Sequence, residues 1–67
     1  MQLIINSDKI DIPNQIRNVT GLLEHFDLKQ KVVIVEVNGV ILEKVNHQDT
    51  QLSDGDRIEI VHFVGGG

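Results

Sequence analysis

The chain has 67 residues, enough for one domain, and its ten acidic and six basic residues give a formal net charge of −4. It contains no cysteine, so its side chains cannot form a disulfide or hold a thioester, a persulfide, an iron–sulfur cluster or a thiolate-bound metal. The acidic balance and the two Phe residues as sole aromatics argue against nucleic-acid binding, which needs a basic face and stacking rings.

Neither a targeting segment nor a membrane span is indicated. Residues 1–15 lack the basic region and the long apolar core of a signal peptide. No apolar stretch approaches the ~20 residues that a membrane-spanning helix needs. We therefore expect a cytoplasmic protein without membrane contacts.

The N-terminal residues predict a β-hairpin. Residues 1–6, MQLIIN, are rich in β-branched side chains, and Ile10 and Ile12 alternate with charged residues in KIDI. The polar NSDK segment between the two strands supplies turn residues. Pro13 ends the second strand, because proline lacks a backbone donor and restricts the residue before it.

A helix is predicted after Asn18, whose side chain is a suitable N-cap. Four apolar residues then fall at positions i, i+3, i+4 and i+7 of one helix face: Val19, Leu22, Leu23 and Phe26. Gly21 costs up to ~1 kcal/mol relative to Ala inside a helix, so packing must hold this helix in place. Leu28 is expected to cover the helix end.

VVIVEVNG is the clearest strand, and Asn38-Gly39 is a strong hairpin signal because both residues tolerate positive φ. Residues 40–44, VILEK, are the predicted returning strand. Alternation divides the first strand into two faces: Val33, Val35 and Val37 on one, and Val32, Ile34 and Glu36 on the other.

The last third of the sequence predicts a connector, a turn and a final strand. Residues 46–51 form a polar connector with room for a helical turn, and Asp54-Gly55 centres a tight turn. The final strand is predicted over residues 57–64, with Ile58 and Ile60 on the face that meets the helix.

These elements predict an α+β protein with the β-grasp, or ubiquitin-like, topology. Its mixed sheet has four to five strands, with one main helix packed on one face. Right-handed strand–helix–strand connections place the last strand centrally, beside the first. We expect residues 1–64 to form the domain and residues 65–67 to be a flexible C-terminal glycine tail.

The terminal sequence HFVGGG suggests that the end of the chain is its working part. Glycine-rich ends are often merely solvated, but these glycines directly follow a strand predicted to lie mid-sheet. Three extended residues reach about 10 Å, and without Cβ atoms they form a thread thin enough for a narrow active site. The ionised carboxylate of Gly67 is a poor electrophile that ATP can activate as an acyl-adenylate.

The sequence resembles the ThiS family, the sulfur carrier proteins of thiamine biosynthesis. The resemblance is carried by VNG after a strand, by DGDRIEIV and by the terminal FVGGG, with the opening hairpin and the NVTGLLEHF helix in matching places. It covers essentially the whole chain and is most specific over residues 54–67. Three departures are NGVILEKVN without a basic-aromatic pattern, Asn18 where Thr is usual, and a third glycine.

The resemblance implies a protein co-substrate and not an enzyme. A ThiF-like adenylyltransferase would use Mg-ATP to adenylate Gly67, with Gly65 and Gly66 entering its active site. Sulfur from a cysteine desulfurase persulfide would then displace AMP and leave a glycyl thiocarboxylate. That group would donate its sulfur to the thiazole synthase ThiG. The chain itself would bind no cofactor.

A partner-binding patch is predicted on the sheet face that the helix leaves open. Residues on the final strand alternate away from Ile58 and Ile60, and the predicted patch comprises Val61, Phe63, Val64 and Ile34. Burying such a side chain contributes about 1.5–3 kcal/mol, so two or three of them suit a transient complex. The alternative is that loops cover these residues or that one of them caps the edge of the core.

The remaining polar residues assign no chemistry. His25, His47 and His62 have no metal-like spacing and are expected at the surface or half-buried, so no metal ligand is assigned. Asp54 and Asp56 belong to a DGD sequence that is first a turn former. No general acid or base is assigned.

Other functions compete with the sulfur carrier of the thiazole branch. A small subunit of molybdopterin synthase (MoaD-like) and a tRNA-thiolation carrier resemble it in fold and in a terminal Gly-Gly. A ubiquitin-like modifier joined to lysines and a β-grasp interaction module with an inert tail are further alternatives. An independent enzyme is the least favoured, because the sequence contains no nucleophile–base set, phosphate loop or metal constellation.

Overall fold

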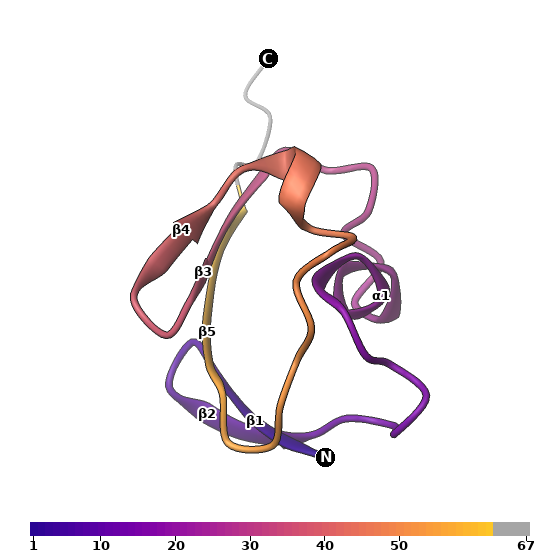
Figure 1. The fold of residues 1–67 in the computed structure, drawn as a ribbon, viewed down its shortest axis with the longest axis vertical. Coiled ribbons are helices and arrows are strands. Elements are labelled where there is room, and N and C mark those ends of the chain that lie inside the picture. The colour runs from indigo at the N-terminus through magenta and orange to yellow at the C-terminus, as the bar shows by residue number, and fades with distance from the viewer. Residues whose placement is uncertain (63–67) are drawn as a thin grey trace.

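The computed structural model describes residues 1–62, which form a mixed five-stranded sheet with one α-helix packed on one face (Figure 1). The strand order is β2-β1-β5-β3-β4; β1 and β5 are parallel, and the other neighbouring pairs are antiparallel. The elements are β1 (Gln2–Ile5), β2 (Asp8–Asp11), α1 (Val19–His25), β3 (Val33–Val37), β4 (Val40–Leu42), the 3₁₀ turn η1 (Lys44–Asn46) and β5 (Arg57–His62). The last strand is therefore central and lies beside the first, as predicted.

Both hairpins turn through residues with positive φ. Asn6 and Ser7, with φ of 49° and 75°, connect β1 to β2. Asn38 and Gly39, with φ of 50° and 86°, connect β3 to β4 as the Asn-Gly sequence predicted. The two-residue turn fixes the register of the hairpin. Val37 lies opposite Val40, and the next pair is Glu36 opposite Ile41.

The helix α1 begins after Asn18, which is its N-cap as predicted and has an extended backbone. Oδ1 accepts a hydrogen bond of 2.8 Å from the Gly21 N–H. Three of the four predicted face residues are buried, and Phe26 is partly buried against the core as the C-cap. Leu28 packs against the same core, which confirms that it covers the helix end.

The strand β4 is shorter than predicted. The returning strand was expected over residues 40–44, but it ends at Leu42. The chain then leaves the sheet edge because the Asn46 N–H donates to the Glu43 carbonyl at 2.9 Å and closes the 3₁₀ turn. The helical turn thus begins at Lys44, before the connector in which it was expected.

The core lies between the sheet and α1. Ile58 and Ile60 on β5 face the helix, as predicted, while Val35 on β3 is fully buried beside them. Two backbone hydrogen bonds hold the connector before β5 against the start of α1. The Val19 N–H donates to the Thr50 carbonyl, and the Leu52 N–H donates to the Arg17 carbonyl. The buried apolar residues are Leu3, Ile5, Ile12, Val19, Leu22, Leu23, Val35, Leu52, Ile58 and Ile60. Within residues 1–62, no helix has the length and apolar character to cross a membrane.

Candidate functional site

The predicted reactive end of the chain lies outside the described residues. This applies to the terminal Gly67, to Gly65 and Gly66, and to two residues of the predicted patch, Phe63 and Val64. The proposed division into a domain of residues 1–64 and a tail of residues 65–67 also stays a prediction. What the structure describes is the strand that leads to them.

That strand, β5, is held on both sides. It pairs with β1 from Ile4↔Arg57 to Ile5↔Ile58, and with β3 from Val37↔Ile58 to Val33↔His62. Because β1 ends before β5 does, the side chain of Asn6 continues the pairing by bonding the backbone of Ile60. The chain is thus held in the sheet up to His62, the last described residue.

Two residues of the predicted patch, Ile34 and Val61, lie directly opposite each other on β3 and β5. Their side chains are 42% and 52% exposed, on the sheet face turned away from α1. The neighbours Val35 and Ile60 in the same ladder are buried against the helix, which fixes the alternation. Neither loops nor the core cover the Ile34–Val61 pair in the described part of the chain.

Further exposed apolar residues were not part of the predicted patch. Val32, just before β3, is 72% exposed, and Ile41 on β4 is 68% exposed. Ile41 lies opposite Glu36, on the same sheet face as Ile34. The Asn-Gly turn could have predicted that Ile41 lies on this face, because a two-residue loop pairs residues at equal distances from it.

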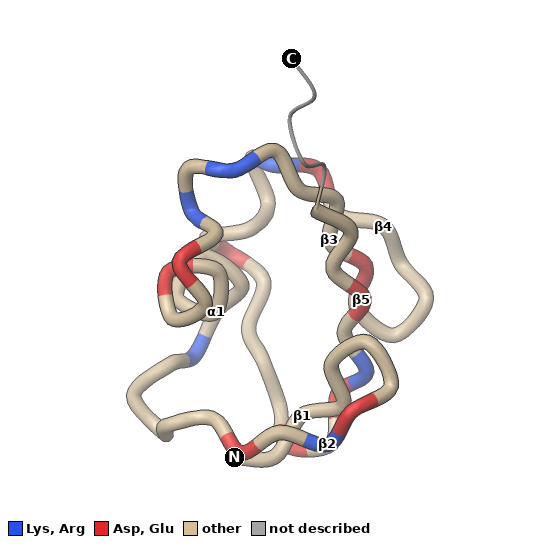
Figure 2. Tube along the Cα trace, turned by 180° about the vertical axis from the view of Figure 1, so that it is seen from behind, with Lys and Arg blue, Asp and Glu red and all other residues tan. Residues whose placement is uncertain are grey.

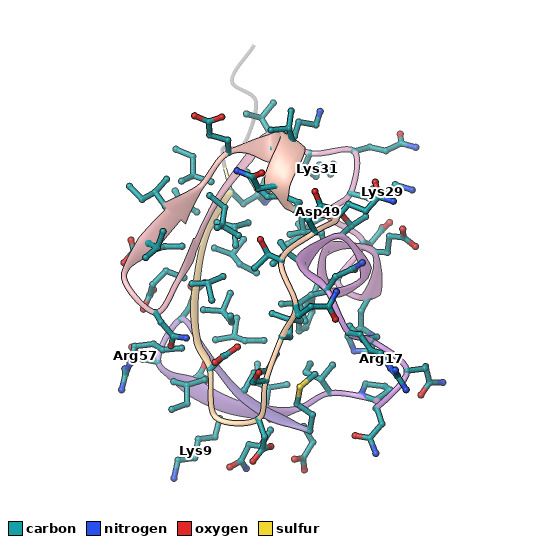
Figure 3. The ribbon with its side chains drawn as sticks, viewed as in Figure 1. Lys9, Arg17, Lys29, Lys31, Asp49 and Arg57 are labelled. Atoms are coloured by element: carbon teal, nitrogen blue, oxygen red, sulfur yellow. The ribbon has the colours of Figure 1, made fainter. Side chains whose placement is uncertain are left out.

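Charged side chains lie on this face of the sheet and at one end of it. Glu36 on β3 and Glu59 on β5 are direct cross-strand partners, both half-buried, two residues along each strand from Ile34–Val61. Figure 2 shows acidic residues along this part of the sheet. Lys9 and Arg57 lie at the end of the sheet where β5 begins (Figure 3).

Lys29 and Lys31 lie at the opposite end of the molecule from Lys9 and Arg57 (Figure 3). Lys29 pairs with Glu24 at 3.2 Å between Nζ and Oε1, and both side chains are more than half exposed. A surface pair of this kind contributes little to stability. It does, however, show that the charges of Lys29 and Glu24 pair with each other, away from the sheet face.

The three histidines have different environments. His25 and His62 are exposed as expected, but His47 is buried, with 7% exposure, which corrects the prediction of a surface or half-buried residue. The 3₁₀ turn carries His47 inward, and its carbonyl accepts from the Thr20 N–H at 3.2 Å. Burial, and to a smaller extent the charge of Lys44, lower the pKa of His47 below its ordinary value of 6.5. Among the described residues, no three His, Asp or Glu side chains gather as a metal site.

A mixed sheet that wraps one helix, with a parallel β1–β5 pair at its centre, defines a ubiquitin-like β-grasp protein. A solved structure of the thiamine biosynthesis protein ThiS from Geobacter metallireducens matches it with a TM-score of 0.82. The two chains are 36% identical, and the match covers 100% of each.

The chain belongs to the ThiS family, the sulfur carrier proteins of thiamine biosynthesis, whose model matches residues 2–67. A ThiS protein is a small sulfur carrier rather than an enzyme. The sulfur carrier protein ThiS of Bacillus subtilis (strain 168) is 40% identical over 65 residues, which are 97% of this chain and 98% of that protein. A thiazole synthase from Paramagnetospirillum magneticum (strain ATCC 700264 / AMB-1) is 34% identical over 67 residues, which cover all of this chain but only 20% of that protein.

Proposed function

We propose that this chain carries sulfur as a thiocarboxylate on Gly67. The observation that carries the proposal is the family match over residues 2–67, because it includes the three glycines as well as the folded body. The pairing of β5 on both sides supports the same proposal, since it presents the chain end from a fixed support.

In the first proposed step, a ThiF-like adenylyltransferase activates the chain end. Gly65 and Gly66 enter its active site, and a carboxylate oxygen of Gly67 attacks the α-phosphorus of Mg-ATP. Pyrophosphate leaves, and the product is an acyl-adenylate. Glycines suit this step because a thread without Cβ atoms fits a narrow channel.

In the second step, sulfur replaces AMP. The outer sulfur of a cysteine desulfurase persulfide attacks the acyl carbon, AMP leaves, and the chain is joined to the donor cysteine through an acyl disulfide. A second thiol then attacks the donor's cysteine sulfur, forms a disulfide with it and releases the thiocarboxylate. This chain needs no thiol of its own for either event, in agreement with its lack of cysteine.

We propose thiazole synthase as the sulfur acceptor. The Paramagnetospirillum relative supports this choice, because a segment similar to the whole of this chain forms one part of a protein named thiazole synthase. Joining two modules in one polypeptide raises the effective concentration of each for the other, which favours partners that act in sequence. No comparable observation favours molybdopterin synthase, tRNA thiolation or protein modification.

The adenylation step is tested by ATP–pyrophosphate exchange with the ThiF-like enzyme of the same organism. We expect exchange that depends on this chain and on Mg²⁺. Deleting Gly66 and Gly67, or adding a C-terminal tag, is expected to abolish exchange while leaving the unfolding midpoint unchanged. Exchange that persists in the folded deletion variant would contradict the proposal.

A further inference from the structure

A small basic cavity lies between the segment that follows α1 and the 3₁₀ turn η1. Three lysines line it: Lys29 and Lys31 from the segment between α1 and β3, and Lys44 from η1. They are three of the six basic residues in a chain with a formal net charge of −4. Figure 3 shows Lys29 and Lys31 far from Lys9 and Arg57. Positive charge is thus concentrated at one place on an acidic protein.

Backbone hydrogen bonds hold both sides of the basic cavity. After α1 the chain turns at Asp27, which has a positive φ of 59°, and the Lys31 N–H donates to the Leu28 carbonyl at 3.0 Å. On the other side, the His47 N–H donates to the Lys44 carbonyl at 3.2 Å at the end of η1. The lysines therefore project from two segments whose backbones are held in place.

The side chain of His47 also lines the basic cavity. This residue is only 7% exposed, yet within residues 1–62 no hydrogen bond is made to its imidazole ring. No side-chain nitrogen in this part of the chain is both sealed from solvent and without a partner, so the ring nitrogens of His47 reach solvent through the cavity. Either nitrogen can donate a hydrogen bond when it carries a proton. His47 thus points to a ligand in a way that the exposed lysines alone do not.

The size and charge of the cavity define that ligand. Its volume of about 210 Å³ holds several waters at about 30 Å³ each, but it is smaller than the roughly 300–1,000 Å³ of typical small-molecule pockets. Within residues 1–62 no acidic side chain lines it, and neither Lys31 nor Lys44 forms an ion pair, whereas Lys29 pairs with Glu24. The cavity therefore suits a small anion.

We propose that the basic cavity binds the phosphate group of a small molecule. The ammonium groups of Lys31 and Lys44 would donate to its oxygens from two sides, and a protonated ring nitrogen of His47 would donate from the cavity wall. A tetrahedral dianion suits these donors better than a carboxylate, because its separate oxygens can accept from separate directions. Inorganic phosphate and a nucleotide both present this group, but a nucleotide would leave its base outside the cavity.

Titration of the full chain with inorganic phosphate at constant ionic strength, followed by the NMR shifts of backbone amides, tests the site. We expect saturable shifts over residues 29–33 and 44–47. The variant Lys31→Gln/Lys44→Gln is expected to raise Kd at least about tenfold, because two charge-assisted hydrogen bonds are lost. The matched control Lys9→Gln/Arg57→Gln removes two positive charges at the opposite end and is expected to change Kd less than about twofold.

The ring of His47 provides an independent readout. Sulfate is the probe, since it is a tetrahedral dianion whose charge does not change over the titration range of histidine. The charged groups around the ring are Lys29, Lys31 and Lys44, which line the cavity with it, and Glu24, which pairs with Lys29. An anion beside the ring favours its protonated form, so saturating sulfate is expected to raise the pKa of His47, measured from its ring-proton shifts. In Lys31→Gln/Lys44→Gln this rise is expected to disappear.

Two results would overturn the inference. Equal phosphate Kd values in the native chain and in Lys31→Gln/Lys44→Gln would exclude binding through these lysines. An unchanged pKa of His47 in saturating sulfate would place the anion outside the cavity.

Adenosine monophosphate distinguishes the two sources of the phosphate group. Binding at residues 29–33 and 44–47 that is tighter than that of inorganic phosphate would support a nucleotide as the ligand, and weaker binding would support the free ion. Neither measurement depends on adenylation of Gly67, which the exchange assay tests separately.

Discussion

The side chain of Asn6 bonds the backbone of Ile60 in both directions. Its Nδ2 donates to the Ile60 carbonyl at 3.1 Å, and its Oδ1 accepts from the Ile60 N–H at 2.8 Å. The left-handed backbone of Asn6 ends β1 and starts the hairpin, while its amide takes the place of the next backbone pair. Asn6 thereby secures β5 two residues before its end.

Removing this amide is expected to loosen the end of β5. Asn6→Gly tolerates the φ of 49° and loses only the two hydrogen bonds, so we expect a loss of about 1–3 kcal/mol in the free energy of unfolding. Asn6→Ala should lose about 1 kcal/mol more, because alanine is strained at that φ. Urea unfolding measures both, and hydrogen exchange should show faster opening at Ile60. An Asn6→Gly variant as stable as the native chain would contradict this role.

The N-cap of α1 provides a second stability prediction. Asn18→Ala removes the bond to the Gly21 N–H and also the bond from Asn18 Nδ2 to the Gln48 carbonyl, which is 3.1 Å long. We expect a loss of about 1–2 kcal/mol. Asn18→Thr keeps a capping oxygen and loses only the bond to Gln48, so we expect a smaller loss than in Asn18→Ala in the same urea titration. Equal losses in the two variants would show that capping is not what Asn18 contributes.

The exposed Ile34–Val61 pair predicts a defect in adenylation without unfolding. Val61→Asp places a charge where the proposed interface is apolar, and we expect its KM in the exchange assay to rise at least about tenfold. Phe63→Ala is expected to act in the same direction. Val45→Asp is the matched control, since Val45 is 76% exposed in η1 and lies off the sheet. Exchange kinetics of the Val61→Asp variant equal to those of the native chain would contradict a role of this patch in adenylation.

Burial of His47 predicts a loss of stability in mild acid. Because the folded-state pKa lies below 6.5, the unfolded chain binds a proton that the folded chain does not. The stabilisation is complete above the unfolded pKa and is lost as the pH falls through the folded pKa. Between about pH 7 and about pH 5, His47→Gln should flatten the fall in unfolding free energy, whereas His25→Gln at an exposed position should not. Parallel curves for the two variants would contradict this origin.

Strand order and core could be predicted because local signals agreed with the topology. Asn38-Gly39 fixed a register, Asn18 marked a helix start, and the Ile58–Ile60 alternation pointed the last strand at the helix. The early end of β4 could not be predicted, since Glu43 and Lys44 fit a strand as well as a turn.

The site was harder to predict than the fold, because cross-strand pairing is a long-range property. Ile34 and Val61 were identified from alternation alone, but their alignment depends on the β3–β5 register. That register also brings Glu36 opposite Glu59, from positions far apart in the sequence. The burial of His47 likewise depends on a 3₁₀ turn that begins at Lys44, ahead of the connector over residues 46–51.

Intact-mass analysis of the chain tests the central claim most directly, after incubation with the ThiF-like enzyme, Mg-ATP, a cysteine desulfurase with cysteine, and a thiol reductant. We expect a mass gain equal to the exchange of one oxygen for one sulfur, and fragmentation should place it on Gly67. Omission of ATP should prevent the change. An unchanged mass with an active enzyme and donor, or isopeptide conjugates to lysines in place of the thiocarboxylate, would contradict a sulfur carrier that works through its terminal glycine.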